Sequence, residues 1–118
     1  MGPLMELTAQ EIGDALVITI HDDRIDAAAA VRFKDSIATN ARSGPDRVVL
    51  DLTAVNFVDS SGLGAIVAVM KILSPKRKLD LCGLTPIVEK VFSLTRMDRV
   101  FAIYPSITEA LATHADSI

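Results

Sequence analysis

The chain has 118 residues, 50% of them hydrophobic, which is enough for one folded domain with a buried core and argues against disorder. Its formal net charge is −3 at pH 7 and its longest basic run is the three residues at 76–78, so we expect no nucleic-acid partner. No apolar run approaches the ~20 residues of a membrane-spanning helix, no signal segment opens the chain, and the single Cys82 cannot form an internal disulfide, which predicts a soluble cytoplasmic protein without membrane contact.

The expected domain covers nearly the whole chain. The opening Met-Gly-Pro-Leu-Met fits either an expression remnant before a native start at Met5 or a plain flexible terminus. We therefore expect residues 1–4 to lie outside the fold. Residues 5–115 should form a single domain, because no repeat or linker interrupts them.

The first predicted elements are two strands and a helix. Residues 4–12 and 15–22 are strand-like runs that flank Gly13-Asp14, a dipeptide suited to a tight turn, so they are expected to pair antiparallel. From Asp26 the spacing becomes helical, and a Ser-Gly-Pro-Asp segment ends that helix. The helix should face the core with an apolar stripe of Ala30, Phe33, Ile37 and Ala41.

The middle of the chain predicts a buried strand followed by a second helix. Residues 48–52 form a nearly unbroken apolar run, typical of a central strand covered on both faces. The polar stretch Asp-Ser-Ser-Gly-Leu-Gly at 59–64 comes next, and the helix behind it should end near Leu73, before Pro75. Residues 78–83 are expected to form another strand. We expect four residues in the core, where truncation to Ala would destabilise the fold: Phe33, Val49, Leu50 and Ile66.

The last third predicts a helix, a strand and a short terminal helix. Thr85 followed by Pro86 provides an N-cap and a first-turn proline for the third helix. The residues of that helix expected to face inward are Ile87, Val91 and Leu94. Residues 99–104 should form the last strand, and Ser106 with Glu109 has the spacing of a capping box.

These elements follow the order β-β-α-β-α-β-α-β-α, which indicates an α/β fold. Helical connections between successive strands imply right-handed crossovers and a mostly parallel sheet, to which the opening hairpin adds an antiparallel portion. Ligands and partners of such sheets meet the loops at the carboxyl ends of strands. The segment at 59–64 is expected at such an end.

The segment at 59–64 has two interpretations, a cap or a site. Asp59, Ser60 and Ser61 can all satisfy the unpaired N–H groups of the helix that follows, while Gly62 and Gly64 allow close packing. The helix itself favours a site, because its apolar arc is roughly 200° wide and one buried face needs only ~100°. Part of that arc is therefore expected to bind another protein.

Two stripes make up this wide arc. The stripe expected in the core comprises Leu63, Ile66, Val67, Met70 and Leu73. The second stripe comprises Gly62, Ala65, Val69 and Ile72. We expect Ala65 and Val69 to contact the partner.

The same residues resemble a known family. Residues 50–73 are similar to the core motif of STAS-domain anti-sigma factor antagonists (anti-anti-sigma factors), in which a similar strand and turn precede the second helix. Residues 11–30 resemble the family's opening hairpin and the start of its first helix, and residues 78–111 resemble its last strands and helices. The resemblance implies a STAS-type mixed sheet with helices packed on it, and a regulator that is neither an enzyme nor dependent on a cofactor.

The resemblance also implies a phosphorylation switch. The family's phosphoacceptor is the serine directly after the Asp, which is Ser60 here. The residues implied as support for its loop are Asp59, Ser61, Gly62, Leu63 and Gly64. The implied partners are an anti-sigma factor that is also a serine kinase with a histidine-kinase-like ATPase fold, and a metal-dependent serine phosphatase. Binding of the unphosphorylated form would release a sigma factor and regulate bacterial transcription.

Two features leave alternatives open. Asp26 matches an acidic family position near the phosphorylation loop and is expected to bind the partner, but it also makes an ordinary N-cap. The family's Gly-Glu-Leu-Asp segment is Asp-Arg-Ile-Asp at 23–26 here. A STAS subunit of a transport or stress-sensing assembly without a sigma-factor client remains the alternative function.

Other site types find little support in the sequence. A hydrolase nucleophile elbow needs G-x-S-x-G, whereas residues 58–62 read Val-Asp-Ser-Ser-Gly. The nucleotide-binding motifs G-x-x-x-x-G-K-[ST] and G-x-G-x-x-G do not occur. His21 and His114 show no metal-ligand spacing, so we expect no metal site. Cys82 is expected to be a buried strand residue, and the basic run at 76–78 a solvated loop.

Overall fold

The computed structural model describes residues 6–41 and 43–116, so the possible remnant at 1–4 lies outside the described residues. A five-stranded sheet has the order β1-β2-β4-β6-β7. Its strands are β1 (Leu7–Ile12), β2 (Ala15–Ile20), β4 (Arg47–Asp51), β6 (Lys78–Cys82) and β7 (Ile103–Tyr104). The first pair is antiparallel and the other three pairs are parallel, which confirms the predicted hairpin and the mixed α/β sheet.

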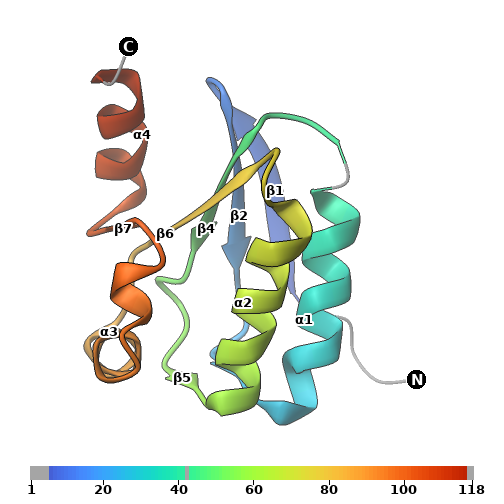
Figure 1. The fold of residues 1–118 in the computed structure, drawn as a ribbon, viewed down its shortest axis with the longest axis vertical. Coiled ribbons are helices and arrows are strands. Elements are labelled where there is room, and N and C mark those ends of the chain that lie inside the picture. The colour runs from blue at the N-terminus through green and yellow to red at the C-terminus, as the bar shows by residue number, and fades with distance from the viewer. Residues whose placement is uncertain (1–5, 42, 117–118) are drawn as a thin grey trace.

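Helices cover both faces of this sheet. They are α1 (Ala27–Asn40), α2 (Ser60–Leu73), α3 (Pro86–Leu94) and α4 (Ile107–Asp116). Figure 1 shows α1 and α2 side by side along the sheet. They pack with α3 on the larger core cluster, whereas α4 packs on a smaller cluster that includes Val17, Val49 and Cys82.

The predicted core is confirmed where the periodicity was strongest. Phe33, Val49, Leu50 and Ile66 are fully buried. Val49 belongs to the cluster under α4, and the other three belong to the cluster under α1 and α2. The apolar run of β4 is therefore covered from both sides, as expected for a central strand.

The predicted inward face of α3 is wrong. Ile87 is 62% exposed and Leu94 is 73% exposed, whereas Val88 and Phe92 are fully buried. Both pairs lie on helical stripes, so periodicity alone does not choose between them. Phe92 decides the orientation, because its ring packs edge-to-face on Phe101 with centroids 6.1 Å apart.

Two further details of this region differ from the prediction. Thr85 is the N-cap residue by position, but its hydroxyl donates to the carbonyl oxygen of Val55 at 2.9 Å instead of capping α3. The expected strand at 99–104 is reduced to β7, and the 3₁₀ helix η1 (Met97–Arg99) precedes it. The capping serine of α4 is confirmed, since Ser106 Oγ accepts from the N–H of Glu109 at 3.2 Å.

A small second sheet pairs the segments that directly precede α1 and α2. Its strands β3 (Arg24–Ile25) and β5 (Phe57–Val58) pair in parallel, with Arg24 opposite Phe57 and Ile25 opposite Val58. The chain then enters α1 after β3 and α2 after β5. The first turns of both helices consequently lie next to each other at one end of the molecule, near the labels of β5 and the lower ends of α1 and α2 in Figure 1.

Candidate functional site

Ser60 begins α2 at the end where the two helices start. It is exposed, as is Ser61, whereas Asp59 before them is partly buried. Asp59 is the N-cap residue of α2 in extended backbone conformation, and its Oδ1 accepts from the N–H of Gly62 at 2.8 Å. The cap interpretation of this segment is therefore correct for Asp59, and it leaves the Ser60 hydroxyl free at the surface.

Asp59 does more than cap its own helix. Its second oxygen, Oδ2, accepts from the N–H of Ala27, the first residue of α1, at 3.1 Å. One carboxylate thus joins the starts of α1 and α2. Both helix dipoles place partial positive charge at this point, which favours negative charge beside Ser60. The sequence indicated the cap but not the bond to the other helix, because 32 residues separate the two groups.

The two glycines of the motif meet different surroundings. A Cβ on Gly62 would lie 1.8 Å from the carbonyl oxygen of Ile25, so only glycine lets α2 approach β3 this closely. A Cβ on Gly64 would have no atom within 4 Å. Gly62 therefore holds Ser60 beside the end of β3, while Gly64 leaves a shallow outer surface next to Ser61.

Asp26 caps α1 and pairs with a neighbouring arginine. Its Oδ1 accepts from the N–H of Ala29 at 3.1 Å, and its Oδ2 accepts from Arg24 Nε at 3.1 Å. The Arg24 hydrogen bond holds the pKa of the Asp26 carboxyl below its ordinary value, despite an opposing contribution from desolvation. The guanidinium also lies over the ring of Phe57, 4.4 Å from its centroid. The capping interpretation of Asp26 is thus confirmed, and the acid is also partly exposed at the rim of the site.

The expectation that Ala65 and Val69 lie on an exposed stripe of α2 is wrong. Ala65 is 7% exposed and Val69 is 1% exposed, and both belong to the large core cluster. The reason is that α1 packs along α2 on one side while the sheet lies beneath it, so the buried face of α2 takes residues from both predicted stripes. Whether either residue contacts a partner stays a prediction. Leu63 and Val67, expected in the core, are only partly buried.

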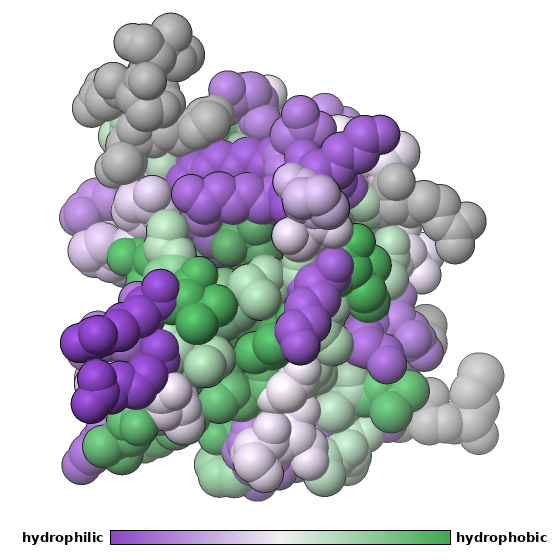
Figure 2. Space-filling view, in the orientation of Figure 1, coloured by the Kyte–Doolittle hydropathy of each residue, from purple (hydrophilic) through white to green (hydrophobic). Residues whose placement is uncertain are grey.

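The surface that α2 does expose near Ser60 is a shallow groove between the two helices. It has a volume of about 230 Å³ and is formed mostly by small side chains. The lining residues are Ser61, Gly64, Ala65 and Ala68 from α2, and Ala30, Val31 and Lys34 from α1. Figure 2 shows mostly hydrophobic residues in the middle of this face, interrupted by a hydrophilic one, with hydrophilic residues above them and at the left edge.

His21 is the histidine whose side chain the structure describes, and its Nε2 lies 3.1 Å from Thr8 Oγ1 on β1. No group of three metal-binding side chains occurs in residues 6–41 and 43–116, to the extent that these are described. The carboxylates beside the motif, Asp59 and Asp26, both accept from backbone N–H groups as helix caps.

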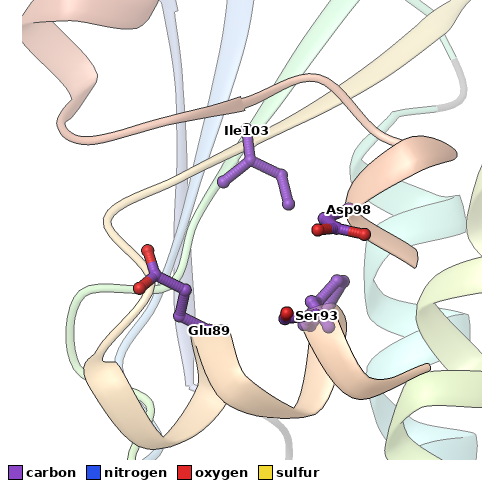
Figure 3. A pocket seen from close by; sticks show the side chains of 5 residues that line it. Glu89, Ser93, Asp98 and Ile103 are labelled. Atoms are coloured by element: carbon purple, nitrogen blue, oxygen red, sulfur yellow. The ribbon is translucent and has the colours of Figure 1, made fainter. Parts of the chain in front are cut away.

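A separate cavity lies away from the motif, between α3, η1 and β7. It has a volume of about 410 Å³, and its floor includes Phe92. Figure 3 shows Glu89 and Asp98 on opposite sides of the opening, with Ser93 on α3 and Ile103 on β7. Ser93 has no histidine lining this cavity with it, so the cavity does not supply the nucleophile and base of a hydrolase.

The remaining sequence predictions are partly confirmed. Cys82 is fully buried, and burial, followed by the charge of Asp51, raises the pKa of its thiol to about 12. The basic run at 76–78 is not simply a solvated loop, because Arg77 is partly buried. Its Nε donates to the carbonyl oxygen of Pro45 at 2.9 Å, and its Nη1 donates to that of Ala41, so it fastens the end of α1.

Comparison with known proteins agrees with this geometry. The STAS domain family matches residues 6–110. BtrV of Bordetella bronchiseptica, named as an anti-sigma factor antagonist, is 31% identical over 109 residues, which cover 92% of this chain and 93% of BtrV. None of the helices in the described part of the chain is long and apolar enough to cross a membrane.

Solved structures show the same fold. The crystal structure of a Thermotoga maritima protein, named as an anti-sigma factor antagonist, is 28% identical with a TM-score of 0.78, over 91% of this chain and 92% of that one. The anti-sigma factor antagonist SpoIIAA in its unphosphorylated form is 20% identical with a TM-score of 0.74, over 96% and 98% of the two chains. Bacillus SpoIIAA has also been solved in a phosphorylated form, at 19% identity and a TM-score of 0.67, over 92% and 98% of the chains. Because the family match spans residues 6–110 and BtrV aligns over more than nine-tenths of both chains, this chain belongs to the STAS-domain anti-sigma factor antagonists, which are non-enzymatic regulators.

Proposed function

We propose that this chain is the phosphorylatable switch of a bacterial partner-switching pathway in the cytoplasm. Its unphosphorylated form would bind an anti-sigma factor that is also a serine kinase, and so release the client sigma factor. The observation that carries the proposal is the exposed Ser60 at the start of α2, next to a carboxylate that already joins two helix starts. Membership in the anti-sigma factor antagonists supports the choice of partner.

The chemistry assigned to Ser60 is simple acceptance of a phosphoryl group. The kinase, with a histidine-kinase-like ATPase fold, would transfer the γ-phosphoryl group of ATP to Ser60 Oγ, whose proton is lost while ADP leaves. A metal-dependent serine phosphatase would hydrolyse the phosphoserine and return the protein to its binding form. This chain contributes no catalytic group to either step.

The fold should tolerate a phosphate at this position. Phosphorylation adds about −1.5 to −2 charges and three acceptor oxygens. The starts of α1 and α2 both carry partial positive charge and lie together here, so they partly stabilise the added anion. Ser60 is exposed, and the phosphate therefore displaces no core side chain.

Docking should not tolerate the phosphate. The proposed contact surface consists of Ser60, Ser61, Gly64 and Asp26. Ser61 and Gly64 line the groove between α1 and α2, Ser60 is exposed beside them, and Asp26 is the partly exposed cap of α1. A hydrated dianion would have to lose water against a partner surface shaped for a neutral hydroxyl, and Asp59 and Asp26 add like charge nearby. A loss of ~3 kcal/mol lowers affinity about a hundredfold, which is enough for a switch.

The proposal is tested with the candidate kinase from the same organism and ATP. Peptide mass spectrometry should find phosphate on Ser60 in the wild type and in Ser61→Ala, and none in Ser60→Ala. A binding titration should show that Ser60→Ala still binds the kinase, whereas Ser60→Glu binds about a hundredfold more weakly while keeping its denaturation midpoint.

Two outcomes contradict the mechanism. One is phosphate on Ser61 alone, and the other is full-strength binding by the Ser60-phosphorylated protein. If the chain bound no anti-sigma factor at all, the alternative of a STAS subunit in a transport or stress-sensing assembly would be favoured instead.

A further inference from the structure

Strand pairing brings Arg24 to the segment that leads into Ser60, although the two residues belong to different elements. Strand β3 places Arg24 directly opposite Phe57 on β5, three residues before Ser60. The hydrogen bond from the N–H of Ala27 to Asp59 Oδ2 then brings the chain after β3 against the residue that precedes Ser60. The guanidinium is thus the basic group that the β3–β5 pair delivers to this end of the molecule.

The present contacts of Arg24 leave most of its hydrogen-bonding capacity unused. Its Nε donates to Asp26 Oδ2 at 3.1 Å, and its plane lies over the Phe57 ring. Within residues 6–41 and 43–116, neither Nη1 nor Nη2 of Arg24 has a hydrogen-bond partner. The side chain is 56% exposed, so much of it is open to solvent while Nε stays bonded to Asp26. Two Nη groups without an acceptor are therefore available beside the segment that leads into Ser60.

We propose that Arg24 forms an intramolecular binding site for a phosphate on Ser60. The proposal rests on Ser60 as the phosphorylated residue. A phosphomonoester presents several oxygens in the geometry that a guanidinium binds with two parallel hydrogen bonds. Arg24 can continue to donate a hydrogen bond to Asp26 through Nε. Its two Nη groups can donate to the phosphate oxygens at the same time, because they point away from the Nε–H.

The charges around Ser60 are mostly negative, so a cation is needed there to offset their repulsion of a phosphate. Asp22, Asp23, Asp26 and Asp59 all lie in or next to the segments that meet here, so the phosphate enters a largely acidic environment. Arg24 offsets part of that repulsion, and it would link β3 to the start of α2. The phosphate is then held in one position at the surface instead of being free to turn away from a docking partner.

The test does not need the kinase. Phosphoserine is installed at position 60 during synthesis with a phosphoserine-specific suppressor tRNA, and the second pKa of the phosphate is measured by phosphorus NMR titration. Loss of a cation that binds the phosphate should raise that pKa by at least about half a unit in Arg24→Gln. Arg24→Lys should restore part of the difference, because it keeps the charge but not the fork.

A matched control removes the same charge elsewhere. Lys71→Gln changes an exposed cation on α2, eleven residues or about 16 Å along the helix from Ser60, and should leave the phosphate pKa within about 0.2 units. Unphosphorylated Arg24→Gln should keep the urea denaturation midpoint of the wild type, because an exposed ion pair contributes little to stability.

An equal phosphate pKa in Arg24→Gln and the wild type would overturn the proposal, as would an equal rise in Lys71→Gln. Failure of the kinase to modify Ser60 would count against the proposed function but would leave this titration unaffected. The two proposals can therefore fail separately.

Discussion

The inner and outer sides of the first turn of α2 contain the same residue type for opposite reasons. Gly62 faces inward, where a Cβ would lie 1.8 Å from the carbonyl oxygen of Ile25. Gly64 faces outward, where a Cβ would have no neighbour within 4 Å. The inner glycine is required by contact between α2 and β3, whereas the fold itself gives the outer glycine no packing role. The motif is thus structural on one side and open to a partner on the other.

The same division continues along α2. Val69 and Ile66 are buried on the inner side, while Ile72 is 57% exposed. An apolar helix surface therefore does not by itself identify an interface, since most of the wide arc is used for packing. The substitutions below are chosen to separate the two sides, from the largest expected change in stability to the smallest.

The largest effect is expected for Val69→Asp. Val69 is 1% exposed, so a carboxylate at this position would be buried without a partner, and we expect the free energy of unfolding to fall by more than about 4 kcal/mol. Urea denaturation measures the loss. The matched substitution Ile72→Asp on the exposed side of the same helix should cost less than about 1 kcal/mol, and similar midpoints for the two variants would show that the assigned sides are incorrect.

The next largest effect is expected for Gly62→Ala. The added methyl group meets a backbone oxygen and the helix must shift away from β3, so we expect a loss of about 3 kcal/mol. Amide hydrogen exchange should accelerate at the β3–β5 pair first, because α2 is packed on it. An alanine variant as stable as the wild type would mean that the close approach of α2 and Ile25 is not required.

Much of this arrangement could be predicted from the sequence, and the failures have physical causes. The five strands of the main sheet and the four α-helices were predicted, and Ser60 was placed correctly at a helix start, whereas the short strands β3 and β5 were not predicted. The face of α3 was wrong because Ile87 and Val88 head two equally good stripes, and a contact distant in sequence, between Phe92 and Phe101, decides between them. Local spacing contains no information about such a contact.

The sequence pattern also did not predict the buried ion pair of Arg47 and Asp80. Arg47 is 6% exposed and Asp80 is 1% exposed, and Arg47 Nε donates to Asp80 Oδ2 at 2.8 Å under α4. Charged residues are usually assigned to the surface unless a partner is known, and here the partner lies on a different strand. The ion pair between Arg24 and Asp26 is easier to predict from the sequence, because side chains two residues apart in an extended segment point to the same side.

A smaller effect is expected for Asp59→Ala, which tests the bond that joins the two helix starts. The N–H groups of Gly62 and Ala27 would both lose their acceptor, and we expect a cost of about 1–2 kcal/mol. Hydrogen exchange should speed up at both amides. Asp26→Ala is the control, since it removes the acceptors of the Ala29 N–H and Arg24 Nε but leaves those of Ala27 and Gly62. Exchange at Ala27 that is unchanged in Asp59→Ala would contradict the link between α1 and α2.

The smallest effect has the opposite sign and is expected for Gly64→Ala. Gly64 is the fifth residue of α2, and glycine inside a helix is about 1 kcal/mol less favourable than alanine. Because the added Cβ meets no atom within 4 Å, the substitution should raise the free energy of unfolding by about 0.5–1 kcal/mol, measured by urea denaturation beside Gly62→Ala. Two changes of the same chemistry, two residues apart, should thus shift the midpoint in opposite directions. A destabilised Gly64→Ala would show that the outer side of this turn is packed in the folded protein, and the division between the two sides of the motif would not hold.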